Sequence, residues 1–128
     1  MKLLRVAHEV GDNAVIVRAE GDVDMSSVHV LVAGLKAGLE LALTHPSHLL
    51  VGDLRPVTYF GSAGLNAVLE CHEQGAEGGV AVRLVAADAR VLRPIEVTNL
   101  DSILDVYPTM DDALGIEPSG TEKPARDS

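Results

Sequence analysis

The run Leu49-Leu50-Val51 constrains the fold of this chain more than any other feature of the sequence. It is apolar with almost no alternation, as is typical of a strand buried on both faces of a sheet. Helical and strand-like segments alternate around it, which indicates parallel strands joined by crossover helices. We therefore expect an α/β fold in which helices pack on a mixed sheet.

The other elements can be placed by their spacing and their turn residues. Two short β-rich runs flank Gly11-Asp12-Asn13, residue types that tolerate tight turns, and predict an N-terminal hairpin. Gly75 is expected to end the second helix, and Pro94 either to begin the third or to kink it. The sequence thus predicts a single α/β domain with a mixed sheet of four to five strands and about four helices. The expected strands are 4–10, 14–20, 47–53, 80–86 and 102–106, and the expected helices are 26–45, 62–74, 90–98 and 110–115.

The length of 128 residues and a hydrophobic content of 47% fit one domain with an aliphatic core. We expect this domain to span residues 1–116. Residues 117–128 contain one alanine as their only apolar residue, so burial cannot offset the entropy lost on ordering them. They are predicted to form a disordered C-terminal tail.

Charge and composition exclude several classes of function. The net charge of −9 opposes binding to nucleic acid or to an anionic membrane, so protein partners are favoured. The single cysteine, Cys71, excludes an internal disulfide and a cysteine metal cluster, which fits a reducing cytoplasm. The sequence has no run of membrane-spanning length and no complete set of metal ligands, so we expect a cytoplasmic protein without membrane insertion, metal or cofactor.

The segment between Asp53 and Leu65 is the strongest candidate for a functional site. A strand ends in an acidic residue, and a short loop then leads to Ser62 at the start of a helix. Sites in α/β folds favour the carboxyl ends of strands. A hydroxyl at a helix N-terminus lies among unpaired backbone N–H groups, so it can cap the helix or carry a phosphate, and the two roles are compatible.

Three pieces of the sequence, in this order along the chain, resemble one known family. Val57-Thr58-Tyr59-Phe60 and Ser62-Ala63-Gly64-Leu65, following a strand that ends in Asp53, resemble the signature of STAS-domain anti-sigma factor antagonists. Gly21-Asp22-Val23-Asp24 is similar to the family's glycine-acid-apolar-aspartate segment, and residues 104–114 are similar to its closing strand and helix. The resemblance covers residues 1 to about 116 in the order of elements.

This resemblance implies a bacterial partner switch and no enzymatic activity. The unmodified protein would bind an anti-sigma factor with serine kinase activity and so regulate sigma-factor-dependent transcription. Phosphorylation of Ser62 would reverse that binding, because a phosphate adds about −1.5 to −2 charges and is costly to desolvate in an interface. The docking surface is expected to contain Asp22, Asp24, Arg55, Thr58, Tyr59, Gly61, Ala63 and Gly64.

Some roles around Ser62 stay open at this point. The family most often has aspartate immediately before the phosphorylated serine, whereas this chain has Gly61. Asp22 and Asp24 could supply an acidic environment instead, although Asp24 is expected mainly to cap the helix that follows it. Gly61 also favours an alternative in which the chain is a non-phosphorylated STAS scaffold subunit of a transporter or stress-signalling complex.

Two further alternatives belong to other classes of function. A small-molecule or nucleotide binder with weak hydrolase activity would use Ser62 as a nucleophile. The nucleophile elbow, however, requires glycine where this chain has Phe60. The edge strand of the N-terminal hairpin could also pair between two chains and give a homodimer.

Overall fold

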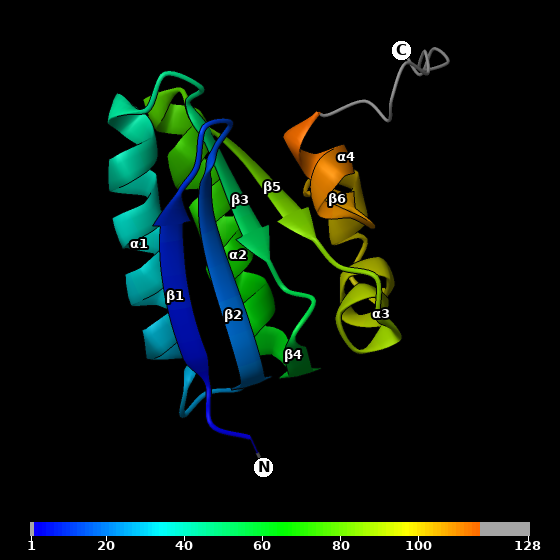
Figure 1. Ribbon diagram of the computed structural model, residues 1–128. Helices are drawn as coiled ribbons and strands as arrows, with labels where there is room; N and C mark the ends of the chain where they lie inside the picture. The colour runs from blue at the N-terminus through cyan, green and yellow to red at the C-terminus, as the bar shows by residue number, and fades with distance from the viewer. Residues whose placement is uncertain (1, 116–128) are drawn as a thin grey trace.

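The computed structural model describes residues 2–115, which fold into an alternating series of strands and helices (Figure 1). The expected tail, residues 117–128, lies outside the described residues. The strands are β1 Arg5–Val10, β2 Val15–Val23, β3 Leu49–Asp53, β4 Val57–Phe60, β5 Ala81–Val85 and β6 Asp105–Tyr107. The helices are α1 Val28–Thr44, α2 Ser62–Gly78, α3 Ala89–Val97 and α4 Met110–Leu114, with a short 3-10 helix, η1, at Leu100–Ser102.

The sheet is mixed, as the sequence predicts. β1 and β2 form the antiparallel hairpin, whereas β2, β3, β5 and β6 are parallel neighbours in the order β1-β2-β3-β5-β6. β4 is an additional strand, in a segment that the sequence predicts to be a loop. It pairs in parallel with the end of β2, beyond the stretch of β2 that pairs with β3.

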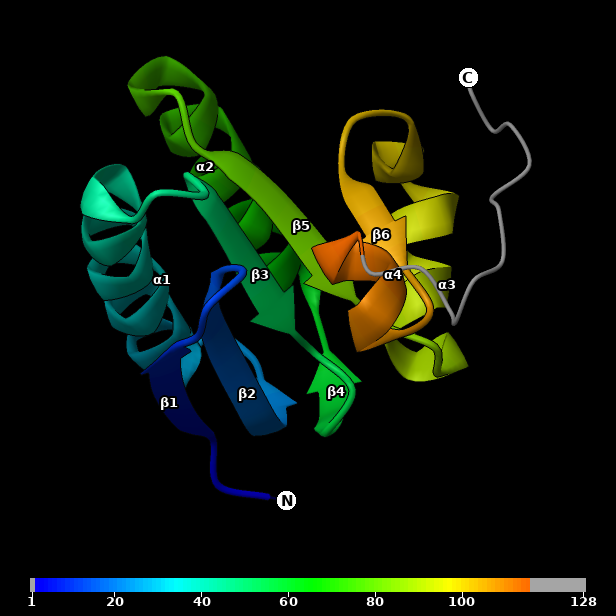
Figure 2. The ribbon, with the colours of Figure 1, turned by 45° about the horizontal axis from the view of Figure 1, so that its top comes forward.

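Helices α1 and α2 cover one face of this sheet (Figures 1 and 2). Their buried side chains join those of β2, β3 and β5 in the main core, in which Leu31, Val17 and Leu50 are almost fully buried. On the other face, Ala113 of α4 packs with Val51 and Val85 in a smaller cluster. β3 is therefore buried on both sides, as its unbroken apolar run predicts.

Several element boundaries differ from the sequence predictions. Helix α2 continues past Gly75 and ends at Gly78, and its C-cap Gly79 has a φ of +78°, which suits glycine. Gly75 instead provides space, because a Cβ there would lie 2.6 Å from Val82 Cγ2. Helix α3 begins at Ala89, capped by Asp88, so Pro94 lies inside the helix and does not begin it. The strand predicted at 102–106 is observed as β6, which begins only at Asp105 and ends at Tyr107. Its expected first residue, Ser102, belongs to η1.

No helix within residues 2–115 combines the length and the apolar character that a membrane span requires.

Candidate functional site

Ser62 is the first residue of α2, and its side chain is exposed. The N-cap of the helix is Gly61, whose carbonyl accepts hydrogen bonds from the N–H groups of Gly64 and Leu65 at 3.0 and 3.2 Å. Ser62 therefore stands one residue inside the helix and is not its N-cap, so the capping role that the sequence allows belongs to Gly61. Its hydroxyl makes no hydrogen bond within residues 2–115.

Strand β4 fixes the position of this helix start. It pairs with β2 so that Tyr59 lies opposite Asp22 and Phe60 opposite Val23. The N–H of Gly61 then donates to the carbonyl of Val23 at 3.1 Å. The pairing shifts by one register at Gly21, which has a φ of +113°. Ser62 is thus presented from the end of a strand ladder.

Asp22 holds the ends of three segments together. Its carboxylate accepts a 2.6 Å hydrogen bond from the hydroxyl of Thr58 on β4 and a 3.0 Å hydrogen bond from the backbone N–H of Lys2. The hydrogen bond from Thr58, followed by that from Lys2, lowers the pKa of Asp22 below its ordinary value. Asp22 therefore has a structural role, because it joins the end of β2 to β4 and to the N-terminal segment.

Asp24 organises the turn before α1. Its Oδ1 accepts hydrogen bonds from the N–H of Ser26 at 2.9 Å, the hydroxyl of Ser26 at 2.8 Å and the N–H of Ser27 at 3.1 Å. The side-chain hydrogen bond from Ser26 is the largest cause that lowers the pKa of Asp24. Asp24 therefore caps the turn that leads into α1, close to the role the sequence suggests.

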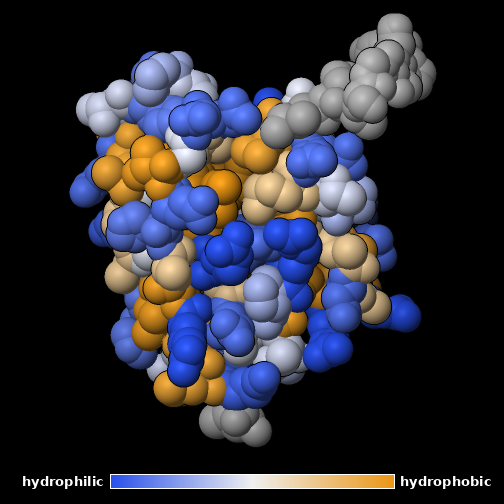
Figure 3. Space-filling view, in the orientation of Figure 1, coloured by the Kyte–Doolittle hydropathy of each residue, from blue (hydrophilic) through white to orange (hydrophobic). Residues whose placement is uncertain are grey.

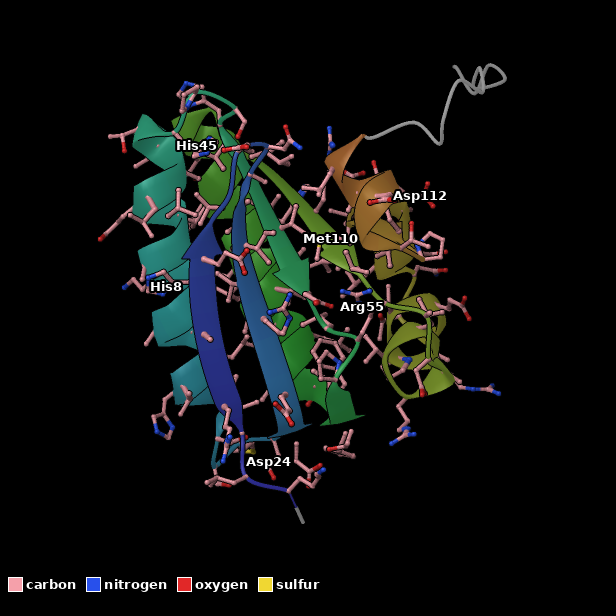
Figure 4. The ribbon with its side chains drawn as sticks, in the orientation of Figure 1. His8, Asp24, His45, Arg55, Met110 and Asp112 are labelled. Atoms are coloured by element: carbon pink, nitrogen blue, oxygen red, sulfur yellow. The ribbon has the colours of Figure 1, made fainter. Side chains whose placement is uncertain are left out.

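Arg55 forms an ion pair at the end of β3. Its guanidinium donates to both carboxylate oxygens of Asp53 at 2.9 Å, and Arg18 donates to the same carboxylate at 3.0 Å. In Figure 4, Arg55 lies near the end of β3 on the face of the sheet opposite α1 and α2, and Asp24 lies at the lower end of the sheet. Figure 3 shows hydrophilic residues gathered over the middle of this face.

The remaining predicted docking residues have different degrees of exposure. Thr58 and Ala63 are half-buried, and the side chain of Tyr59 is 54% exposed. Gly64 is buried, since a Cβ there would lie 2.7 Å from Phe60 Cε1. The structure thus brings Asp22, Thr58, Tyr59 and Gly61 to one end of the β2–β4 ladder, while Gly64 lies beneath the surface.

A groove of about 430 Å³ runs between α1 and α2 and begins at Ser62. One wall carries Ser62, Asn66 and Glu70, which are four residues apart and so lie on one side of α2. The opposite wall carries Val28 and Val32 of α1 and Met25 of the turn before it, whose side chain is 86% exposed. Met25, Asn66 and Glu70 are not among the site residues that the sequence predicts, although the four-residue spacing from Ser62 indicates that Asn66 and Glu70 share its side of α2.

The histidine, cysteine and acidic side chains away from Ser62 have structural roles. Within residues 2–115, no three His, Cys, Asp or Glu side chains are grouped as metal ligands would be. His45 is buried, and its ring nitrogens bond to the carbonyl of Gly11 at 2.8 Å and the N–H of Ser47 at 3.1 Å. Cys71 lies in the core, and desolvation raises the pKa of its thiol to about 12.

Comparisons with known proteins agree with this architecture. The STAS domain family model matches residues 5–113. The anti-sigma-F factor antagonist RsfA of Mycobacterium tuberculosis is 32% identical over 103 residues, which are 80% of this chain and 79% of RsfA. A crystal structure of an anti-sigma factor antagonist from Mycobacterium paratuberculosis superposes with a TM-score of 0.79 at 29% identity, over 88% of this chain and 92% of that one.

A more distant structure shares the fold alone. The Bacillus cell fate determinant SpoIIAA in its phosphorylated form superposes with a TM-score of 0.61 at 13% identity, over 88% of this chain and 96% of SpoIIAA.

The family match covers most of the described residues, and the mycobacterial relatives are antagonists of anti-sigma factors. This chain therefore belongs to the STAS domain family, among its anti-sigma factor antagonists.

Proposed function

We propose that this chain binds an anti-sigma factor with serine kinase activity and is released from it when Ser62 is phosphorylated. In this scheme the chain is a binding protein and not an enzyme. It acts in the bacterial cytoplasm, where the anti-sigma factor and the sigma factor are. Binding of the unmodified chain frees a sigma factor for transcription. Phosphorylation of Ser62 returns the anti-sigma factor to that sigma factor.

The observation that carries this proposal is the position of Ser62. Its hydroxyl is exposed, makes no hydrogen bond within residues 2–115 and stands in the first turn of a 17-residue helix. A kinase can therefore reach it without opening the fold. The phosphate product adds about −1.5 to −2 charges. That charge is compatible with the helix, because the unpaired N–H groups and the helix dipole favour anions at its N-terminus.

The surroundings of Ser62 explain why a partner would leave. Asp22 and Asp24 lie at the ends of the elements beside it, and both carboxylates are ionised at neutral pH, because the pKa of each lies below an ordinary value that is itself far below 7. Met25 and the groove beside Ser62 offer apolar contacts that a partner can bury. A phosphate at this edge would have to lose its hydration next to existing negative charge, so the bound state is destabilised while the fold is retained.

The proposal can be tested by capture followed by phosphorylation. The unmodified chain would be used to isolate an anti-sigma factor from lysate of its own cell, and the complex would then be incubated with ATP. We expect mass spectrometry to find one phosphate on Ser62. The Ser62→Ala variant should remain unmodified, whereas Ser102→Ala, which removes another exposed serine, should be modified like the wild type.

Two outcomes would contradict the proposal. One is a phosphate that appears elsewhere, or not at all, in a complex with an active kinase. The other is co-purification with a transporter ATPase or a sensor complex and with no anti-sigma factor, which would indicate the scaffold role.

A further inference from the structure

Strand β1 forms a free edge of the sheet. It pairs with β2 on one side, and no strand within residues 2–115 pairs with its other side (Figure 1). Two devices that commonly blunt such an edge are missing, because β1 has no proline and its register with β2 runs from Arg5 to Val10 without a bulge. All of its residues except Val6 are exposed. The edge is therefore open to another strand.

The backbone groups of β1 alternate between its two sides. At the hairpin turn, the N–H of Gly11 donates to the carbonyl of Ala14 at 2.9 Å. In an antiparallel pair, the N–H and C=O groups of every second residue point away from the partner strand. Counting back from Gly11, the groups that point outward are those of Val10, His8 and Val6. A second strand at this edge would bond to these three residues.

The charged side chains of β1 match those of a second copy of the chain. Val6 faces α1, because a Cβ on Gly34 of that helix would collide with it, so Arg5, Ala7 and Glu9 lie on the other face of the sheet. The two charges are equally far from Ala7 along the strand. When two copies pair antiparallel about Ala7, Arg5 of each lies opposite Glu9 of the other. Neither residue makes an ion pair within residues 2–115.

The same register also uses the outward backbone groups. It sets Val6 opposite His8 of the second copy, and the N–H and C=O groups of both residues point outward. Registers centred on Val6 or on His8 use these groups as well, but they set Arg5 opposite Ala7 or Gly11. Both charge pairs are then lost, so charge complementarity favours the register centred on Ala7.

Helix α1 lies over the same edge and would add apolar contacts. Val30, Ala37 and Leu41 lie four, three and seven residues from Gly34, so they share its side of the helix and are half-buried. Strands in a sheet are about 4.8 Å apart. Because α1 lies over β1 and β2, the α1 helices of two paired copies would be roughly 10 Å apart, which is close to the packing distance of about 8–10 Å.

We propose that two copies of this chain join their β1 strands into one continuous sheet, antiparallel about Ala7, with Arg5 of each copy paired with Glu9 of the other. The two α1 helices pack beside each other on one face of that sheet. The groove beside Ser62 is lined by residues of α1 that face α2, so it stays open in the dimer. The inference goes beyond the proposed function and does not depend on phosphorylation.

The first experiment measures self-association of the purified chain by sedimentation velocity from about 10 to 500 µM. We expect a reversible species of twice the 13.4 kDa mass of the chain. Arg5→Glu and Glu9→Arg should each weaken dimerisation about tenfold or more, because each sets like charges opposite one another in both pairs. Glu96→Arg makes the same charge change at an exposed position on α3 and should alter the dissociation constant by less than about twofold.

Mixing the two variants tests the register. Arg5→Glu and Glu9→Arg complement each other, so an equimolar mixture should dimerise like the wild type although neither variant does so alone. General repulsion between acidic chains cannot explain this pattern, because Glu9→Arg reduces the net charge of −9 and yet should weaken association. Recovery in the mixture would also show that both variants are folded.

Amide hydrogen exchange of the wild type gives a check that needs no variant. The N–H groups of Val6 and His8 should exchange more slowly at about 500 µM than at about 10 µM, because the dimer bonds them. The N–H of Met25, in the turn before α1, should exchange equally at both concentrations.

Three outcomes would overturn the inference. One is a chain that remains monomeric at about 500 µM. Another is a dimer that persists in both single variants, or that the mixture fails to recover although circular dichroism shows both variants folded. If either variant is unfolded, exchange of Val6 and His8 that does not depend on concentration is the deciding result against it. All of these outcomes leave the proposed function in place, because capture of an anti-sigma factor does not require β1 pairing.

Discussion

The ion cluster at the end of β3 should be a measurable source of stability. Asp53 is 1% exposed, and its carboxylate accepts three side-chain hydrogen bonds of 2.9 to 3.0 Å from Arg18 and Arg55. It also accepts a 3.1 Å hydrogen bond from the backbone N–H of Arg55, which bends the chain toward β4. The substitution Asp53→Asn keeps the shape of the side chain but removes its charge.

The expected cost of Asp53→Asn follows from these contacts. A hydrogen bond to a charged group contributes about 1.5–3 kcal/mol, but both arginine side chains are roughly half exposed and recover hydration when the charge is lost. We therefore expect the free energy of unfolding to fall by about 2 kcal/mol in urea titrations at pH 7. Asp105→Asn, at an exposed position on β6, is the matched control and should change it by less than about 0.5 kcal/mol.

Acidification gives an independent check of the same cluster. Burial raises the pKa of Asp53, but the hydrogen bonds from Arg55 and Arg18 together outweigh it, so the pKa is lowered overall. A lowered pKa means that the stabilisation is present above the unfolded value of about 3.9 and is lost as the pH falls through the folded value. The difference between the wild type and Asp53→Asn should therefore shrink below about pH 4. A cost under about 0.5 kcal/mol at pH 7, or one that does not shrink in acid, would refute this reasoning.

Three further predictions concern the core and the helix ends. Cys71 is buried and the pKa of its thiol is raised to about 12, so it should resist alkylation by iodoacetamide at pH 8 in the folded chain and react in urea. Rapid labelling of the folded chain would contradict the buried position of Cys71. Gly64→Ala should destabilise by about 1–3 kcal/mol in urea titrations, because its Cβ would lie 2.7 Å from Phe60 and 2.9 Å from Val23. Gly79→Ala meets no atom within 4 Å but has a φ of +78°, so it should cost only about 1 kcal/mol, and a larger loss would indicate an unseen contact.

The sequence predicts those elements whose formation depends on residues close together in the chain. The turn residues Gly11-Asp12-Asn13 predict the hairpin, and the apolar spacing after Ser26 predicts α1. The unbroken run in β3 predicts a central strand, because a strand covered on both faces has no polar side. These features depend on neighbours a few residues away, which the sequence displays directly.

Features that depend on long-range contacts could not be predicted in the same way. β4 has only four residues and exists because it continues the ladder along β2, past the register shift at Gly21. Arg18 is 35 residues from Asp53, so nothing in the local sequence links them. The groove beside Ser62 likewise arises only when α1 packs against α2.

A phosphate on Ser62 should separate the chain from its anti-sigma factor without unfolding the chain. The most direct measurement is the dissociation constant of that complex for the unmodified and the Ser62-phosphorylated chain, with the melting temperature of each form recorded alongside. We expect phosphorylation to weaken binding by about 100-fold, equivalent to about 2.7 kcal/mol, while the melting temperature changes little. Equal affinity of the two forms, or weaker binding accompanied by loss of the folded state, would contradict it.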